Sequence, residues 1–426
     1  MNINFVQKQN NMNRIILIGN GFDLAHGLPT SYGNFMDWYW NEWKIKLVSS
    51  SVNTIQDNLC EFTLLGKGNT WLSFLYDKVS RIDPVTGKEL VDFLKKVPGV
   101  KINPCNFLEE ISKSIETKGW VDIENEYYKL LIRCSKGEIL GLNHMTLNTQ
   151  LNNLRYLLIE YLNNFSINND SLELKQEIKS IIYSPINPND VSVNQQQLLD
   201  DHINYWIHQN EKSWHDRFEQ YEKCVFYNRN GIEDLKSKFC STDYKCSIDS
   251  EYVNPYFLLP NNILFLNFNY TPTPYLYVQK NNPWFEVNHI HGELSNPESV
   301  VFGYGDELDE NYKKLSDLND NEYLKCFKSI KYLESDRYRK ALQFMDAAPF
   351  QVCIMGHSCG NSDRTFLNTL FEHKNCVSIK PYYHLKKDGT DNYLDIVQNI
   401  SRNFTDMKLM RDRVVNKTFC EPFSSK

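Results

Sequence analysis

The chain of 426 residues has 41% hydrophobic and 23% charged residues, which is typical of a globular protein with two or three domains, or with one core and a large insertion. Its net charge of −7 argues against nucleic-acid binding through a broad basic surface. No apolar run approaches the roughly 20 residues that span a bilayer, and the polar, Asn-rich start is unlike a signal peptide, so we expect a cytoplasmic protein with no membrane partner.

The 11 cysteines are scattered along the chain, and none belongs to a Cys-x-x-Cys pair. This usage is typical of reduced, buried thiols in a reducing compartment. Cys240 and Cys246 lie in a polar segment without a matching second pair. A four-cysteine zinc site is therefore not expected, and we expect no bound metal.

The first strong pattern is an apolar run, Ile15 to Ile18, that leads directly into Gly19-Asn20-Gly21. A short apolar run that ends in glycines predicts a buried strand of a parallel sheet. The helix-compatible segment from Phe22 to His26 would follow as the start of a βα unit. The glycines have two interpretations at this point: a turn that binds phosphate at a helix start, or a plain tight turn.

Helical patterns dominate the next part of the chain. An aromatic helix is predicted from Tyr32 to Leu47, with capping by Thr30 or Ser31. Further amphipathic patterns, without glycine-closed strands between them, predict a mainly helical insertion. Its expected helices are Thr70–Val79, Lys88–Lys96, Phe107–Glu116, Ile123–Cys134, His144–Asn164, Leu172–Ser184 and Asn194–Cys224.

Strand patterns return near residue 262, and the first four of them deliver glycine or polar residues at their carboxyl ends. The predicted strands are 262–271, 286–292, 300–305, 351–358 and 375–383. Parallel strands present their carboxyl ends along one edge, where ligands bind. The sequence therefore predicts an α/β fold with a doubly wound parallel sheet of the Rossmann type. Its expected parts are 1–48 as the first βα unit, 49–255 as the insertion, 256–410 as the rest of the core and 411–426 as a polar tail.

Several residues in these segments could carry chemistry. His289 and His291 alternate along one strand, so only one of them can reach a site at the strand end, and His291 lies nearer to it. A structural role for both histidines is the alternative. Gly356-His357-Ser358-Cys359-Gly360 matches the Gly-x-Ser-x-Gly turn of serine hydrolases, which makes Ser358 a second candidate, as nucleophile or as ligand contact. In the insertion, Asp122 is expected to cap a helix, whereas Glu124 either belongs to the same helix start or lies at the rim of a site.

The segment from Ile16 to Tyr32, ILIGNGFDLAHGLPTSY, resembles the opening of the bacteriophage abortive-infection AbiH family. Later blocks resemble that family in the same order, and together they span residues 14 to about 383. These blocks are Trp120–Glu124, Asn267–Thr271, His289–Gly292, and Gly356–Ser358 with Asp363.

The AbiH family in turn resembles sirtuin-like NAD-binding domains, which implies a sirtuin-like core and roles for particular residues. The resemblance implies His291 as general base and Asn269 as the residue that positions a ribose. It also implies a ligand-binding role for Gly19, Asn20, Gly21, Phe22, Asp23, Gly356 and Ser358. Two departures stand against sirtuin deacylases: the chain lacks their zinc ribbon, and Thr271 occupies the position of their carboxamide-binding Asp.

The resemblance implies an antiphage effector that hydrolyses NAD, or a related nucleotide, at its N-glycosidic bond. NAD would be the substrate or ligand, a phage-derived molecule the trigger, and the protein a homo-oligomer. Two alternatives remain open at this stage: a non-catalytic sensor of NAD or ADP-ribose, and a serine hydrolase that uses Ser358.

Overall fold

The structure is a computed structural model of the chain. It describes residues 11–49, 53–65, 77–81, 87–118, 122–165, 172–209, 212–213, 216–217, 255–278 and 282–423. The predicted helix over residues 70–79 lies largely outside the described residues, as do Cys240 and Cys246.

The chain forms two compact units, each built from separate segments. Unit 1 comprises Met1–His26, Ile167–Val300 and Tyr332–Lys426, and unit 2 comprises Gly27–Ser166 and Val301–Lys331.

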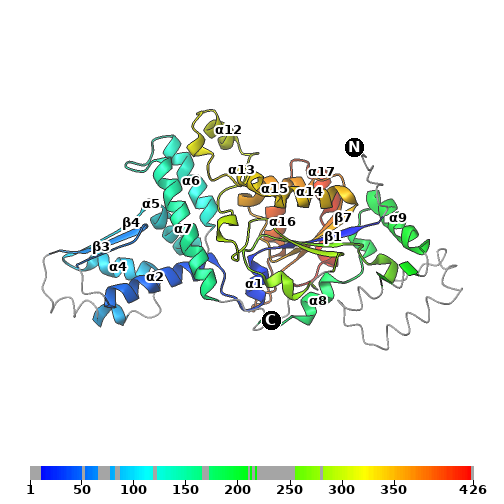
Figure 1. The fold of residues 1–426 in the computed structure, drawn as a ribbon, viewed down its shortest axis with the longest axis horizontal. Helices are drawn as coiled ribbons and strands as arrows, with labels where there is room; N and C mark the ends of the chain where they lie inside the picture. The colour runs from blue at the N-terminus through cyan, green and yellow to red at the C-terminus, as the bar shows by residue number, and fades with distance from the viewer. Residues whose placement is uncertain are drawn as a thin grey trace. The chain divides into compact units, whose positions relative to one another are not determined.

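A five-stranded parallel sheet is the centre of unit 1 (Figure 1). The strand order across the sheet is β6 (Phe285–His289), β5 (Ile263–Asn267), β1 (Asn13–Ile18), β7 (Phe350–Met355) and β8 (Cys376–Tyr382). Every residue of β1, β5, β7 and β8 is buried, as expected for parallel strands covered on both faces. The predicted α/β class is therefore confirmed.

The strand order places a topological switch point between β1 and β7. From β1 the chain adds β5 and β6 on one side, then returns to add β7 and β8 on the other. Because crossovers between parallel strands are right-handed, this reversal moves the connecting helices to the opposite face. Ligands bind at the carboxyl ends of strands beside such a point. The candidate site is therefore expected where β1 and β7 end.

Helices cover both faces of the sheet, with α1 and α8 on one face and α14 and α15 on the other (Figure 1). The helices of unit 1 are α1 (Asn20–Ala25), α8 (Gln176–Ile182), α9 (Gln196–Ile207), α14 (Arg337–Ala347), α15 (Arg364–Phe371), α16 (Tyr393–Arg402) and α17 (Met407–Arg413). Residues 411–426 were expected to form a polar tail. Within this segment, however, Phe423 is buried, and the centre of its ring lies 5.8 Å from that of Phe22, so the segment packs against the core of unit 1.

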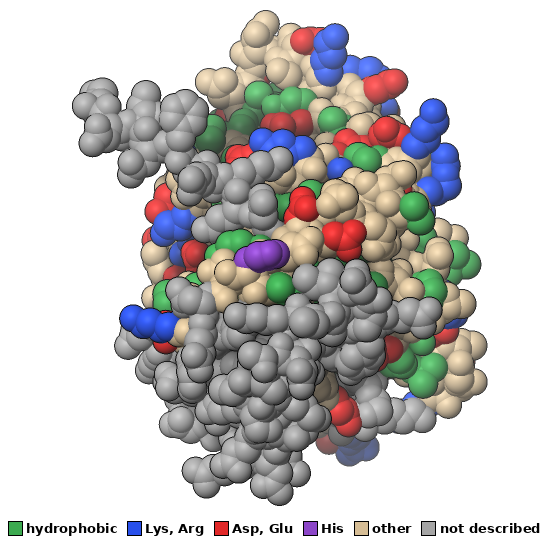
Figure 2. All heavy atoms as spheres, turned by 90° about the vertical axis from the view of Figure 1, so that its right-hand side faces the viewer, with side chains coloured by type: hydrophobic (Ala, Val, Ile, Leu, Met, Phe, Trp, Pro, Cys, Tyr) green, Lys and Arg blue, Asp and Glu red, His purple; other side chains and the backbone are tan. Residues whose placement is uncertain are grey.

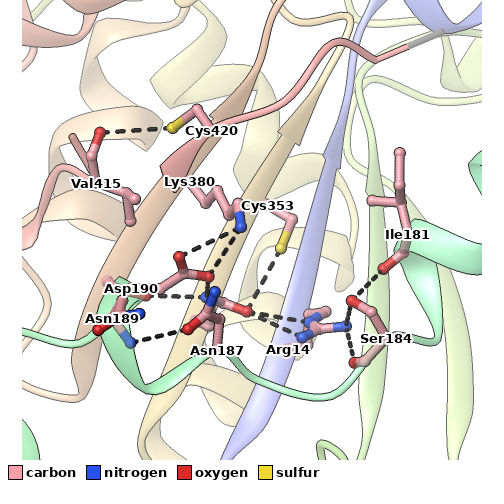
Figure 3. Close-up of polar contacts among 12 residues, drawn as sticks. Arg14, Ile181, Ser184, Asn187, Asn189, Asp190, Cys353, Lys380, Val415 and Cys420 are labelled. Carbon is pink, nitrogen blue, oxygen red and sulfur yellow. Dashed lines mark hydrogen bonds and ion pairs between the residues drawn. The ribbon is translucent and has the colours of Figure 1, made fainter. Parts of the chain in front are cut away.

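A polar ladder crosses the amino-terminal half of the sheet (Figure 3). Arg14 and Gln351 are register partners, and so are Gln351 and Ser378. Arg14 donates to the Gln351 side-chain oxygen from Nε and Nη2, at 3.2 and 3.1 Å. Gln351 Nε2 in turn donates to Ser378 Oγ and to Asp190 Oδ2, both at 3.2 Å.

The ladder ends in a buried ion pair between Asp190 and Lys380, with Lys380 Nζ 3.2 Å from Asp190 Oδ2. Burial raises the pKa of Asp190, and the Lys380 ammonium opposes that rise. At the other end, Arg14 donates to the carbonyl oxygens of Ile182 and Ser184. The ladder therefore fastens the segment from Ile182 to Asp190 onto three neighbouring strands.

Unit 2 combines helices with a three-stranded antiparallel sheet that the sequence patterns did not predict. Most of the expected helices are confirmed where the structure describes them. The helices are α2 (Tyr32–Ser49), α4 (Gly87–Lys96), α5 (Asn106–Lys118), α6 (Ile123–Ser135), α7 (His144–Asn164), α12 (Glu310–Ser316) and α13 (Lys328–Lys331); the strands are β2 (Thr54–Gln56), β3 (Cys60–Leu64) and β4 (Val100–Pro104).

The predicted strand over residues 300–305 is wrong. Its backbone pairs with neighbours inside unit 2 rather than with the parallel sheet: Gly303 N–H donates to Glu124 Oε1 at 3.0 Å, and Tyr304 N–H donates to the Cys326 carbonyl at 3.1 Å. Gly303 lies against the Cys326 carbonyl, where a Cβ would clash. The glycines in this segment therefore mark a close backbone crossing, which a short apolar run does not reveal.

Figure 2 shows one face of the molecule, on which basic and acidic side chains lie interspersed over the described residues. Exposed ion pairs such as Lys340–Asp336, at 3.0 Å, contribute about 0–1 kcal/mol each to stability.

None of the described helices is both long and apolar enough to cross a membrane.

Candidate functional site

Two glycine turns meet at the carboxyl ends of β1 and β7. Gly21 N–H donates to the Gly356 carbonyl at 2.8 Å, and Gly19 N–H donates to the Met355 carbonyl at 3.3 Å. A Cβ on Gly19 would lie 2.5 Å from His357 Cα, and one on Gly21 would lie 2.8 Å from Gly356 Cα. Gly356 has φ of +74° and lies against the backbone N of Phe22. The glycines are therefore required by the contact between the two turns.

The contact between the two glycine turns also determines which backbone N–H groups remain available to donate hydrogen bonds to a ligand. Gly21 N–H is bonded to Gly356, and Phe22 N–H donates to the Gly19 carbonyl at 2.9 Å. Helix α1 has only six residues. Two of the amides that a phosphate-binding turn would offer are therefore already bonded within the protein.

The segment after β5 links the turns to the rest of the edge. Asn269 Nδ2 donates to the Gly19 carbonyl at 2.9 Å, which ties the end of β5 to the end of β1. The ring of Phe268 lies 4.9 Å from that of His291 and 4.4 Å from that of His357. The segment therefore contacts the glycine turn on one side and two histidines on the other.

His291 and His357 share one carboxylate, that of Asp363. His291 Nε2 lies 3.3 Å from Asp363 Oδ1, and His357 Nε2 lies 3.6 Å from Asp363 Oδ2. His291 Nε2 also lies 3.0 Å from the hydroxyl oxygen of Tyr332. Only 4% of His291 and 6% of His357 are exposed. A carboxylate between two imidazoles can orient both rings and stabilise a proton on either one.

Local backbone geometry presents these side chains at the edge. His291 follows β6 and precedes Gly292, whose φ of +86° turns the chain away from the sheet. His357 follows Gly356, and Cys359 N–H donates to His357 Nδ1 at 3.0 Å. Because Nδ1 accepts this bond, the His357 proton lies on Nε2 and faces Asp363 when the ring is neutral.

An aromatic group surrounds the histidine pair. The ring of Phe268 lies 5.7 Å from that of Phe366, and Phe366 lies 6.1 Å from Tyr332 and 5.4 Å from Tyr338. Tyr332 stacks on His291 with ring centres 6.0 Å apart. Apolar rings lower the local dielectric, which strengthens the electrostatic coupling of the histidines with Asp363.

Asp23 is a buried acid at this edge with a perturbed pKa. It lies on α1, is only 1% exposed, and accepts a hydrogen bond on Oδ2 from Thr271 Oγ1 at 2.7 Å. Its other oxygen, Oδ1, is buried and has no hydrogen-bond partner among the described residues. Burial raises the pKa of Asp23 to about 6, although hydrogen bonding, mainly from Thr271, opposes the rise. Perturbed, underbonded acids of this kind are concentrated at functional sites.

His289 carries a second underbonded group. Asn267 has a fixed orientation, because its oxygen accepts Asn269 N–H and its NH₂ donates to the Thr271 carbonyl. The same NH₂ lies 3.1 Å from His289 Nδ1, which must therefore accept. Burial lowers the pKa of His289, so the neutral ring carries its proton on Nε2. That buried nitrogen has no hydrogen-bond partner among the described residues.

The structure thus brings most of the predicted site residues to one edge of the sheet. Gly19, Gly21, Phe22, Asp23, Asn269, His291 and Gly356 all belong to the contacts above. Ser358 is exposed, and its carbonyl accepts a bond from Asn399. Both histidines face Asp363 rather than the Ser358 hydroxyl, so the geometry does not supply the base that a serine nucleophile needs.

Three participants were not among the predicted site residues: His357, Asp363 and Tyr332. For His357 and Asp363 a signal existed, since both follow a glycine-closed strand that ends at the predicted ligand edge. No comparable signal exists for Tyr332, because it lies in a charged helical stretch far from any strand end.

In the insertion, Asp122 caps α6 as predicted, accepting Asn125 N–H at 3.0 Å. Glu124 pairs with Lys328 Nζ at 2.7 Å within unit 2, and both side chains are buried. These contacts account for the burial of Glu124 inside its own unit.

No cluster of three or more His, Cys, Asp or Glu side chains within the described residues is arranged to hold a metal ion.

No curated protein and no solved structure matches the chain. A family model described as "Bacteriophage abortive infection AbiH" matches residues 15–384, a range that includes Gly19, Asn269, His291 and Asp363. The chain therefore belongs to the bacteriophage abortive-infection AbiH family.

Proposed function

We propose that this protein is an abortive-infection effector that hydrolyses the N-glycosidic bond of NAD or a related nucleotide. Family membership supports the role in abortive infection. One observation carries the chemistry: His291, at the carboxyl-end edge of the parallel sheet, lies within 3.3 Å of both an acid and a phenol. A sirtuin-like core, as the sequence resemblance implies, is part of the proposal, and the strand order with its switch point supports it.

In the proposed reaction, His291 acts as general base on a water molecule. The water oxygen bonds to the anomeric carbon of the ribose, and its proton passes to His291. The carbon–nitrogen bond breaks, and its electron pair goes to the leaving ring nitrogen. Asp363, 3.3 Å from His291 Nε2, stabilises the imidazolium that forms when His291 takes the proton.

Binding of the nucleotide is assigned to residues of the same edge. Asn269 positions the ribose, and its attachment to the Gly19 carbonyl fixes its side chain before the ligand arrives. The segment Gly19–Asp23 and the residues Gly356 and Ser358 provide the remaining contacts. The two underbonded groups, Asp23 Oδ1 and His289 Nε2, fit a polar ligand that offers both a donor and an acceptor.

The test is nicotinamide release from NAD by the purified full-length protein, alone and with extract from phage-infected cells. We expect His291→Ala to lower the rate roughly 100-fold or more, because general base catalysis contributes that much. His208→Ala, which removes an exposed histidine directly after α9, is the matched control and should keep the wild-type rate. Equal rates for wild type and His291→Ala would refute the assigned base.

A non-catalytic sensor is the second candidate. It is favoured by the burial of His291 and by the engagement of its Nε2 with Tyr332 and Asp363. Calorimetry with NAD and ADP-ribose separates the two functions. Binding without nicotinamide release, with and without infected-cell extract, would establish the sensor and exclude the hydrolase.

A further inference from the structure

Three features of the first glycine turn determine which part of a ligand can lie against it. The amides of Gly21 and Phe22 are already bonded to backbone carbonyls. Helix α1, which begins within the turn, carries an acid, Asp23, in its first turn. One oxygen of that acid is buried without a hydrogen-bond partner among the described residues.

The first two features disfavour a phosphate at this turn. A phosphate is held by several backbone N–H groups and by positive charge, whereas the turn has committed two amides and carries a carboxylate. Placing a phosphate beside an ionised Asp23 in a buried setting would bring two anions together where the dielectric is low.

The third feature indicates what the turn does recognise. A buried carboxylate oxygen without a donor is costly to keep, and a ligand N–H or O–H would remove that cost. Thr271 fixes the orientation of the carboxylate through Oδ2, so Oδ1 is held in one direction. Thr271 also belongs to the segment that carries Asn269, the proposed ribose contact.

We propose that Asp23 is a specificity-determining residue that accepts a hydrogen bond on Oδ1 from the bound nucleotide. The donor is a neutral group, either a sugar hydroxyl or a primary amide, and the phosphates lie away from the first glycine turn. The inference rests on the proposed function, because it assigns a contact to the same nucleotide site. It differs from the sequence-based expectation that the Gly19–Gly21 turn binds the pyrophosphate.

The experiment measures binding to the full-length protein by calorimetry with three probes: nicotinamide mononucleotide, nicotinic acid mononucleotide and inorganic pyrophosphate. The variant is Asp23→Asn, which keeps the shape of the side chain. Asp395→Asn, an exposed acid on α16, is the control for the change in net charge. Thermal unfolding of each variant verifies that it is folded.

We expect Asp23→Asn to weaken nicotinamide mononucleotide binding at least tenfold, and Asp395→Asn to leave it unchanged. If the donor is the amide, nicotinic acid mononucleotide binds the wild type far more weakly, because its carboxylate offers no donor. If the donor is a sugar hydroxyl, the two mononucleotides bind alike and both depend on Asp23. Pyrophosphate binding should not weaken in Asp23→Asn.

Three results overturn the inference, and the first two are distinguishable from the third. Unchanged nucleotide affinity in Asp23→Asn, or pyrophosphate binding that tightens when the charge is removed, would refute the role of Asp23 and leave the proposed function standing. If the wild type binds neither mononucleotide nor NAD, the proposed function fails, and the inference fails with it.

Discussion

Replacement of Asp23 by Asn should stabilise the protein at neutral pH. Asp23 is buried, and its pKa is raised from 3.8 to about 6, chiefly by burial. A raised pKa means that the folded protein holds the charged form less favourably than the unfolded chain does. Asn keeps the acceptor for Thr271 Oγ1 and removes the charge, so it removes this cost.

The magnitude follows from the difference between the two pKa values. A rise from 3.8 to about 6 corresponds to roughly 3 kcal/mol of destabilisation once the group is ionised in both states. The stability contributed by protonated Asp23 is fully present below the unfolded pKa of 3.8 and is lost as the pH rises through about 6. The advantage of Asp23→Asn should therefore be near zero at pH 3.8 and reach up to roughly 3 kcal/mol at pH 7.5.

The assay is thermal unfolding of both proteins from pH 4 to pH 8, followed by circular dichroism. For a unit of this size, roughly 3 kcal/mol corresponds to a rise in Tm of about 6–12 °C. Other groups titrate in the same range, but their contributions cancel when the two proteins are compared at each pH. A lower Tm for Asp23→Asn at pH 7.5, or a difference that does not vary with pH, would refute the reasoning and make Asp23 a stabilising residue of the fold.

Two further predictions concern the packing of the same unit. Gly356→Ala should destabilise the fold by roughly 3 kcal/mol or more, because a Cβ at positive φ would clash with the first turn, whereas Gly389→Ala, at φ of +84° with open space around it, should cost about 1 kcal/mol. Equal losses in denaturant unfolding would contradict the close contact of the turns. Lys380→Met should cost roughly 3–5 kcal/mol, because it leaves Asp190 as a buried, unpaired acid. The matched control Lys374→Met removes an exposed cation and should change stability by about 1 kcal/mol or less, so a similar cost for both would show that the buried pair is not structural.

Sequence patterns were sufficient for the parts of the fold that depend on local signals. The run from Ile15 to Ile18 is continuously apolar and ends in glycine, so it could be assigned to a buried parallel strand with its end at a ligand edge. The same logic placed Asn269 and His291 at neighbouring strand ends. In contrast, β2 and β4 are short and carry polar residues, which gives them no such signal.

The features of the site that the sequence did not predict depend on contacts between distant parts of the chain. The raised pKa of Asp23 requires burial beside Thr271, a residue 248 positions away. The position of Tyr332 against His291 depends on how its helical stretch packs on the sheet. The glycines at 19, 21 and 356 were expected to serve a ligand, whereas their closest neighbours are one another's backbones. The composition and the hydrophobic periodicity of the sequence do not predict any of these contacts.

The central position of β1 has a consequence for how the protein is made. It precedes both of its sheet neighbours in the chain: Asn269 pairs with Gly19 across 250 residues, and Gln351 pairs with Arg14 across 337. At ordinary rates of translation, an apolar strand would wait roughly 20–70 s for its second neighbour. Such a chain depends on protection from aggregation while it grows. A truncated product that ends before Phe350 lacks β7, His357 and Asp363, so the proposed activity at this edge would require synthesis to continue past Asp363.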